Sequence, residues 1–192
     1  MKILKKILLL DKDGTLIETK SGKPFINEDP GDQRIIIGAD LVLQRARNEG
    51  WRIGVASNQL GIEKGYKTAE TTRAEFDFLG QLFPEIEIAV WCPDYGASMH
   101  EVVYASPEED SVANDHNCYD IAQLKEKHSF AYRGFRKPEP GMLQYLKQYF
   151  DYQKGDRVFY VGDRSEDQSA AANADVYFLN AKVFRGNFLE LC

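Results

Sequence analysis

Short apolar runs recur along this chain, and stretches with helical spacing of apolar residues lie between them. An apolar run of that length, bounded by glycine or charged residues, is typical of a strand that is buried on both faces. Strands that alternate with helices build a parallel sheet with helices on both of its faces. We therefore expect an α/β domain. The predicted strands are residues 6–10, 52–56, 86–91, 158–161 and 176–179, and the predicted helices are residues 39–49, 68–82, 140–150 and 165–173.

The length of 192 residues fits one domain, 1–192, and a hydrophobic fraction of 43% is ample for its core. Residues 17–37 are predicted to form a polar loop or a small hairpin, because glycine and proline punctuate them. Residues 92–133 show no clear periodicity, and a loop of that length is usually functional, disordered or a misread element. We expect an insert or a lid over the site there, with a short helix at residues 119–128.

Charge and composition argue against several functional classes for this chain. The formal net charge of -6 gives no global basic field toward nucleic acid or membrane, although a local basic patch is compatible with it. No apolar run approaches the roughly 20 residues that span a bilayer. The basic start of the chain lacks the small-residue cleavage site of a signal peptide. The 3 cysteines fit a reducing compartment better than a disulfide framework, so we expect a cytoplasmic protein, with a monomer favoured.

The strand predicted at residues 6–10 is followed directly by Asp11-Lys12-Asp13-Gly14-Thr15. Both carboxylates therefore lie at the carboxyl end of a strand, where open α/β sheets bind their ligands. They share one face of the strand and diverge once the chain turns at Gly14, so that one can attack while the other handles a proton. The same spacing occurs in calcium loops, but those need a further glutamate ligand and a helix on each side.

Three further motifs lie beside the ends of predicted elements. Ser57-Asn58-Gln59 follows a strand, and its hydroxyl and backbone amides can hold phosphate oxygens. Arg136-Lys137-Pro138 precedes a helix, where a lysine can neutralise a phosphoryl group. Gly162 to Asp167 follows another strand, and Asp163 and Asp167 are hard oxygen ligands of the kind that magnesium prefers. Each motif taken alone also has a structural reading, as a turn, a solvated lysine or an acidic helix start.

The order and placement of these four motifs resemble those of the haloacid dehalogenase superfamily of phosphatases. The resemblance extends from Leu8 to about Leu179. It implies a Rossmann-like fold and a magnesium-dependent phosphomonoesterase. By the same resemblance, Asp11 is the nucleophile that forms an aspartyl-phosphate, and Asp13 is the general acid and base. A non-enzymatic binding module on the same fold is disfavoured, because Asp11 and Lys137 are both present.

The resemblance also indicates how metal and phosphate would be held. Magnesium would be bound by Asp11, Asp163 and the backbone carbonyl of Asp13, while Asp167 would orient a metal-bound water or pair with Lys137. Phosphoryl oxygens would be held by Ser57 and Lys137. The further residues expected to contact phosphate or substrate are Thr15, Asn58, Lys20, Lys23 and Arg34.

Two branches of the superfamily compete for the substrate. Thr15–Phe25, Ser57–Gly65 and Arg136–Met142 resemble the polynucleotide kinase 3'-phosphatases, which remove 3'-phosphates from damaged DNA ends. In that branch a 3'-phosphorylated nucleic-acid end is the expected substrate, and its backbone would be faced by Lys20, Lys23 and Arg34. No Gly-x-x-x-x-Gly-Lys-[Ser/Thr] loop is present, so we expect no kinase module. The net charge counts modestly against a tight nucleic-acid binder.

The alternative branch contains the heptose bisphosphate and histidinol phosphate phosphatases. These share the Asn58-Gln59-x-Gly61-Ile62 and Arg136-Lys137-Pro138 patterns, and they usually carry a zinc loop between the two. The chain lacks the usual cysteine pairs of that loop, which weakens this branch. A zinc site is conceivable by ligand type although its spacing matches no zinc pattern, and its ligands would be Cys92, His100, His116 and Cys118.

Overall fold

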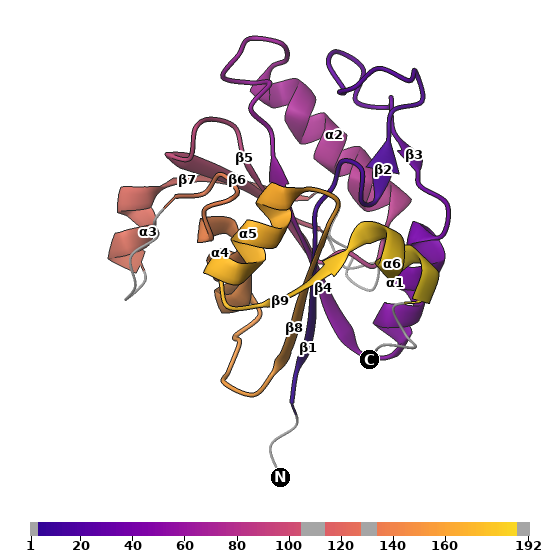
Figure 1. Ribbon diagram of the computed structural model, residues 1–192. Coiled ribbons are helices and arrows are strands. Elements are labelled where there is room, and N and C mark those ends of the chain that lie inside the picture. Colours follow the sequence, from indigo (N-terminus) through magenta and orange to yellow (C-terminus); the bar gives the residue numbers. More distant parts are fainter. Residues whose placement is uncertain (1–3, 105–113, 128–133, 188–192) are drawn as a thin grey trace.

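The computed structural model describes residues 4–104, 114–127 and 134–187, and one large sheet runs through this part of the protein (Figure 1). Its strands are β1 (Lys6–Leu10), β4 (Trp51–Asn58), β5 (Ile88–Cys92), β6 (Ser98–Val103), β7 (Asp115–Asp120), β8 (Arg157–Gly162) and β9 (Tyr177–Asn180). Their order is β7-β6-β5-β4-β1-β8-β9. Strands β5, β4, β1, β8 and β9 are parallel, whereas β6 and β7 extend the β5 edge in antiparallel fashion. The predicted parallel α/β fold is confirmed.

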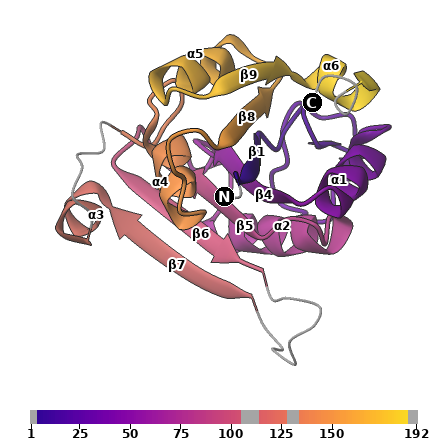
Figure 2. The same cartoon turned by 90° about the horizontal axis from the view of Figure 1, so that it is seen from below.

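Helices cover both faces of the sheet, as Figure 2 shows. One face packs against α1 (Ala39–Asn48), α2 (Ala69–Leu82) and α6 (Ala181–Asn187). The other face packs against α3 (Ile121–Lys127), α4 (Gly141–Tyr149) and α5 (Ser165–Asn173). Among the described residues, no helix has both the length and the apolar composition needed to cross a membrane.

Strand β1 shows why the sheet forms where the sequence predicts it. Its residues Ile7 to Leu10 are all fully buried. Because successive side chains of a strand point to opposite faces, Leu8 and Leu10 enter the core beneath α1 and α2. Ile7 and Leu9 enter the core beneath α4 and α5. A strand covered on both faces needs an unbroken apolar run, and this run places β1 at the centre of the sheet.

The segment between β1 and α1 forms a small antiparallel hairpin of β2 (Ile17–Glu18) and β3 (Arg34–Ile35). This agrees with the polar loop or small hairpin predicted for residues 17–37. Helix α2 begins after Thr68, whose side-chain oxygen accepts a hydrogen bond from the backbone N–H of Thr71. That cap is the one predicted from the sequence.

The expected insert at 92–133 is more regular than its sequence indicates. Its described part contains β6, β7 and α3, and α3 agrees with the short helix predicted at residues 119–128. The sequence does not predict strand β7. This strand lies at the edge of the sheet, and its sequence, Asp115–Asp120, is therefore largely polar. Residues 105–113 and 128–133 lie outside the described part. Helix α6 also escaped prediction, although Ala181 and Phe184 face the core.

Candidate active site

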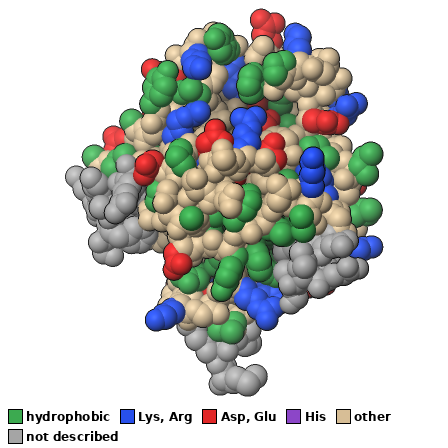
Figure 3. Space-filling model, viewed as in Figure 1, with side chains coloured by type: hydrophobic (Ala, Val, Ile, Leu, Met, Phe, Trp, Pro, Cys, Tyr) green, Lys and Arg blue, Asp and Glu red, His purple; other side chains and the backbone are tan. Residues whose placement is uncertain are grey.

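The residues predicted to carry the chemistry meet at the carboxyl ends of the three central strands. Asp11 directly follows β1, Ser57 lies near the end of β4, and Asp163 directly follows β8. Because β1 is hydrogen-bonded to β4 on one side and to β8 on the other, these three positions are neighbours. Such a point in a parallel sheet is where α/β proteins bind ligands. Figure 3 shows acidic and basic side chains gathered at this end of the molecule.

Lys137 is the cation at the centre of the site. Its Nζ donates a hydrogen bond to Asp11 Oδ1 at 2.6 Å and lies 2.7 Å from Asp167 Oδ1. The same Nζ donates to the hydroxyl of Tyr160 at 2.8 Å and to the backbone carbonyl of Ala56 at 3.1 Å. Lys137, Asp11 and Asp167 are all buried. A buried ammonium with this many partners is fixed in place, so the positive charge stays beside Asp11.

Asn58 holds the backbone of Lys137. Its Oδ1 accepts a hydrogen bond from the Lys137 N–H at 2.9 Å, and its Nδ2 donates to the Lys137 carbonyl at 3.0 Å. This double contact joins the end of β4 to the loop before α4. Asn58 was predicted to contact phosphate, and the structure shows that its amide is engaged in positioning Lys137.

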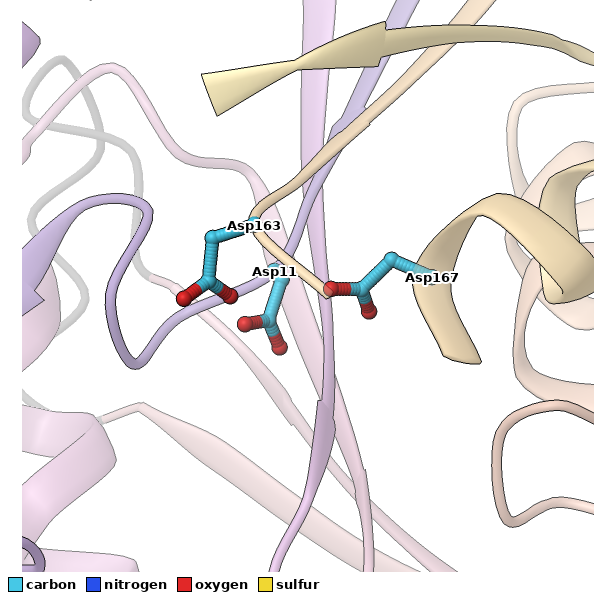
Figure 4. Close-up of side chains that lie close together, drawn as sticks. All are labelled: Asp11, Asp163 and Asp167. Carbon is cyan, nitrogen blue, oxygen red and sulfur yellow. The ribbon is translucent and has the colours of Figure 1, made fainter. Parts of the chain in front are cut away.

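Asp11, Asp163 and Asp167 form an acidic cluster, and their side chains point toward one another in Figure 4. One carboxylate oxygen from each lies within 4.8 Å of the others. Asp167 comes from the first turn of α5, where its Oδ2 also accepts a hydrogen bond from the backbone N–H of Arg164 at 3.1 Å. Three carboxylate oxygens converging beside one lysine are a donor set that suits a hard cation such as magnesium.

Burial and neighbouring negative charge both act against the ionised forms of the carboxylates in the acidic cluster. Burial raises the pKa of Asp11 to about 7, and the charges of Asp167 and Asp13 act in the same direction while Lys137 opposes them. Burial also raises the pKa of Asp163. Although burial disfavours its charge, Asp11 and Asp167 raise the pKa of Lys137. A cation bound among these carboxylates would favour their ionised forms.

Asp13 turns away from the acidic cluster toward a separate set of donors. Its Oδ2 accepts a hydrogen bond from Gln59 Nε2 at 2.9 Å, and its Oδ1 accepts one from Lys12 Nζ at 3.1 Å. Burial disfavours its charge, but Lys12 and Lys67 outweigh burial and lower the pKa of Asp13. The Asp13 side chain is 37% exposed, so it is still open to a bound substrate. The expected divergence of the two carboxylates is therefore present.

Two glycines allow the loops of the site to approach each other. Gly14 has a φ of 82°, which favours glycine. A Cβ on Gly14 would collide with the carboxylate of Asp163, and a Cβ on Gly162 would collide with the side chain of Asp167. Any larger residue at either position would therefore displace an acid of the cluster.

A cavity of about 220 Å³ opens above these residues. Its walls include Asp11, Asp13, Ser57, Lys137 and Asp167. No described residue of the 92–133 segment lines it, because β6 and β7 extend the sheet at its β5 edge and α3 packs on the face that α4 and α5 cover. Further cations around the same cavity are Lys64, Lys67, Arg136 and Arg164.

The remaining residues predicted to contact substrate lie off this cavity. Thr15 is fully buried and does not line it. Lys20 donates to the backbone carbonyl of Gly31 at 2.7 Å, and Arg34 pairs with Glu18 at 2.9 Å. Lys23 lies at a second surface hollow, which adjoins the cavity at Asn27 and Tyr66. The structure thus does not bring Lys20, Lys23 and Arg34 together with the nucleophile.

The residues considered for zinc are divided between two faces of the sheet. Cys92 is buried in the core beneath α4, on the face opposite to that of its neighbour Trp91. His100 and His116 both contact the ring of Trp91, and Cys118 lies 3.5 Å from His100 Nε2. The sheet itself separates Cys92 from the other three. Within the described residues, the acidic cluster is the only group of three or more such ligands close enough to share a metal.

Several residues of the site carried no usable sequence signal. Lys12 lies between the two aspartates, at a position that the Asp-x-Asp pattern does not specify, and Tyr160 resembles an ordinary core residue of β8. Lys67 and Glu75 lie in a polar stretch around the start of α2 and resemble solvated charges. Gln59 did stand within the Ser57-Asn58-Gln59 motif, but its contact with Asp13 follows only from the fold.

Comparison with protein families adds a match over most of the chain. Residues 6–183 match the family model described as polynucleotide kinase 3 phosphatase. A D-glycero-beta-D-manno-heptose-1,7-bisphosphate 7-phosphatase of Pseudomonas putida is 28% identical over 167 residues, which is 86% of this chain and 76% of that protein. A Thermoplasma volcanium relative named "Probable D-glycero-D-manno-heptose-1,7-bisphosphate 7-phosphatase" is 33% identical over 92 residues. That match spans 46% of this chain and 60% of the relative.

Solved structures with the same fold include two full-length matches. The D,D-heptose 1.7-bisphosphate phosphatase of B. bronchiseptica, complexed with magnesium and phosphate, has a TM-score of 0.62 at 17% identity. The match covers 97% of this chain and 99% of that one. A Had-superfamily hydrolase from Ehrlichia chaffeensis has a TM-score of 0.51 at 14% identity, with 100% and 99% covered. At these identities the likeness concerns the fold.

Proposed function

Because the chain belongs to the polynucleotide kinase 3 phosphatase family and is a phosphoric monoester hydrolase, we propose that it hydrolyses a small sugar phosphate of the heptose bisphosphate class. The observation that carries this proposal is the cavity of about 220 Å³, which has the reactive carboxylates at its base and additional cations around it. A substrate with a second phosphate would place that group among those cations.

Asp11 is the nucleophile in this proposal. Its carboxylate attacks the phosphorus, the bond from phosphorus to the leaving oxygen breaks, and Asp13 gives a proton to that oxygen. In the second step Asp13 takes a proton from a water molecule, and the water oxygen attacks the phosphorus of the aspartyl-phosphate. Inorganic phosphate leaves and the Asp11 carboxylate is restored. The divergence of Asp11 and Asp13 supports this division of labour.

Lys137 and Ser57 hold the phosphoryl oxygens. The Lys137 ammonium is already buried beside Asp11, so it needs little rearrangement to offset the charge that builds up on the phosphoryl group. Ser57 is buried in the cavity wall, and its Oγ accepts a hydrogen bond from Gln59 Nε2 at 2.9 Å. Its own hydroxyl proton remains free to point at a phosphoryl oxygen.

The acidic cluster fits magnesium, which we place at Asp11, Asp163 and Asp167 together with the backbone carbonyl of Asp13. All of these donors are hard oxygens, and burial, together with the neighbouring carboxylate of Asp167, raises the pKa values of Asp11 and Asp163. When bound, magnesium supplies positive charge that keeps the nucleophile ionised and balances the phosphoryl oxygens.

A 3'-phosphorylated nucleic-acid end is the second candidate substrate, and the family match over residues 6–183 favours it. It is the substrate first expected from the sequence. The cations that would hold its backbone, Lys20, Lys23 and Arg34, lie outside the cavity. A nucleic-acid end would therefore have to reach the nucleophile while its chain crosses the β2–β3 hairpin.

The test is phosphate release with magnesium from heptose 1,7-bisphosphate, histidinol phosphate, a 3'-phosphorylated oligonucleotide and p-nitrophenyl phosphate. We expect the highest kcat/KM for the heptose bisphosphate. Lys64→Met should raise KM for that substrate and leave p-nitrophenyl phosphate nearly unaffected, because the aryl ester has no second phosphate. A higher kcat/KM for the oligonucleotide would overturn the sugar-phosphate assignment in favour of the second candidate.

A further inference from the structure

A network of buried charges lies behind Asp13, on the side away from the acidic cluster. Glu75 is fully buried in α2, and its carboxylate contacts Lys67 Nζ at 2.8 and 3.0 Å and Lys12 Nζ at 3.2 Å. Lys12 is also fully buried. Lys67 is 5% exposed. Buried charges are costly unless they are paired, and the steps of mechanism proposed above leave this network without a role.

The network reaches Asp13 through the side-chain amide of Gln59. Lys67 Nζ donates to Gln59 Oε1 at 2.5 Å. The other end of the amide, Nε2, donates to Asp13 Oδ2 and to Ser57 Oγ, each at 2.9 Å. An ammonium can only donate hydrogen bonds, so Lys67 can contact only the oxygen end of the amide. Lys67 therefore selects the orientation in which the amide N–H groups face Asp13 and Ser57.

Removal of Lys67 would weaken the preference of the Gln59 amide for this orientation. The amide would then keep its contacts with Asp13 and Ser57 but lose the one that fixes its oxygen, so it could rotate away from the carboxylate of Asp13. Lys12 holds the other oxygen of Asp13 at 3.1 Å, and Glu75 is the partner that Lys12 and Lys67 share. One carboxylate in α2 thus supports the donors on both oxygens of the general acid.

We propose that Lys67 is a positioning residue for proton transfer: it fixes the Gln59 amide, which in turn fixes the carboxyl group of Asp13. The role rests on the proposed assignment of Asp13 as the general acid. A difference between substrates tests the step in which the leaving oxygen gains a proton, and kcat/KM reports that step without the later hydrolysis, in which Asp13 acts as the base. Esters whose leaving groups are good enough to depart unprotonated do not need that step, whereas poor leaving groups do.

The test compares phenyl phosphate with p-nitrophenyl phosphate, whose leaving groups are similar in size and differ in acidity. Lys67→Met should lower kcat/KM for phenyl phosphate by about tenfold or more and kcat/KM for p-nitrophenyl phosphate by less than about threefold. Lys67→Arg, which keeps a cationic donor, should restore most of the loss. Lys64→Met removes the same charge from the cavity wall without touching Gln59, so it should change both substrates by the same factor.

Gln59→Met provides a second route to the same result if Lys67→Met proves unstable in a thermal melt. It removes the amide itself, and it should show the same selective loss on phenyl phosphate. Equal loss on both esters in whichever of these variants folds would overturn the positioning role. A wild-type enzyme that hydrolyses neither ester would instead overturn the proposed phosphatase mechanism, so the two failures are distinguishable.

Discussion

Lys137 Nζ lies 2.6 Å from Asp11 Oδ1, although the two residues are 126 positions apart in the chain. Asp11 is placed by the end of the central strand, and Lys137 is placed by the loop before α4, which Asn58 ties to the end of β4. The contact joins the nucleophile to the cation that would bind the phosphoryl group. It exists only when β1, β4 and α4 are all assembled, so the fold itself completes the site.

The first prediction concerns the carboxylate that attacks phosphorus. Asp11→Asn removes the nucleophile and should reduce phosphate release to background. The side chain keeps its size, so the far-UV circular dichroism spectrum and a cooperative thermal melt should be retained. Turnover by this variant at a rate near that of the wild type would contradict the assignment of Asp11.

The second prediction concerns the hydroxyl of Tyr160. It accepts a hydrogen bond from Lys137 at 2.8 Å and donates to Asp167 at 3.1 Å. A hydrogen bond to a charged group contributes about 1.5–3 kcal/mol, so Tyr160→Phe should lower kcat by about tenfold. The measurement is steady-state kinetics with p-nitrophenyl phosphate. Tyr145→Phe removes a buried hydroxyl that bonds to Glu101, away from the site, and should leave kcat nearly unchanged.

The third prediction concerns Gly14. A Cβ on Gly14 would be strained by the positive φ and would collide with the carboxylate of Asp163. Gly14→Ala should therefore displace a carboxylate of the acidic cluster and weaken magnesium affinity by about tenfold or more. The apparent magnesium constant for activity measures this. Gly22→Ala has a similar positive φ but nothing within 4 Å of the added Cβ, so any effect on magnesium there would contradict the steric reason.

The fourth prediction concerns pH in the absence of magnesium. The pKa of Asp11 is raised to about 7 in the folded protein, so folding favours its protonated form. That contribution to stability is complete below the pKa of the unfolded state and is lost as pH rises through about 7. The melting temperature without magnesium should therefore decline between about pH 5 and about pH 8, by less in Asp11→Asn than in the wild type.

Magnesium should reverse this trend, because it binds the ionised carboxylate. The rise in melting temperature on adding magnesium should be larger at about pH 8 than at about pH 5. An equal rise at both pH values would argue that the cation does not bind at Asp11.

The parts of the fold that the sequence predicted are those where burial leaves a simple pattern. Ile7 to Leu10 are apolar throughout because β1 is covered on both faces, and Asp11 then marks the end of the strand. Strand β7 carries no such pattern, because an edge strand is partly exposed and its sequence is polar. Strand β7 is defined by its hydrogen bonds to β6. These form only when the chain packs, so a local sequence pattern does not predict them.

The residues of the site could be predicted from the sequence where they lie next to a predicted strand or helix. Asp11, Asp13, Lys137 and Asp163 follow strands or precede a helix, and the fold brings all four to one end of the sheet. Lys67 and Glu75 gave no signal, because a buried pair of charges and a solvated pair look alike in sequence. Lys20, Lys23 and Arg34 are predicted from charge type alone, and the structure places them outside the cavity, so their contact with a substrate stays a prediction.

The most direct test of the mechanism is to trap the covalent intermediate. Asp13→Asn lacks the base for the second step, and p-nitrophenol leaves without needing an acid. After this variant is mixed with magnesium and radiolabelled p-nitrophenyl phosphate and quenched in acid, peptide mapping should locate the label on Asp11, in proportion to the p-nitrophenol released. Label on another residue, or release of p-nitrophenol without any label on the protein, would contradict an aspartyl-phosphate at Asp11.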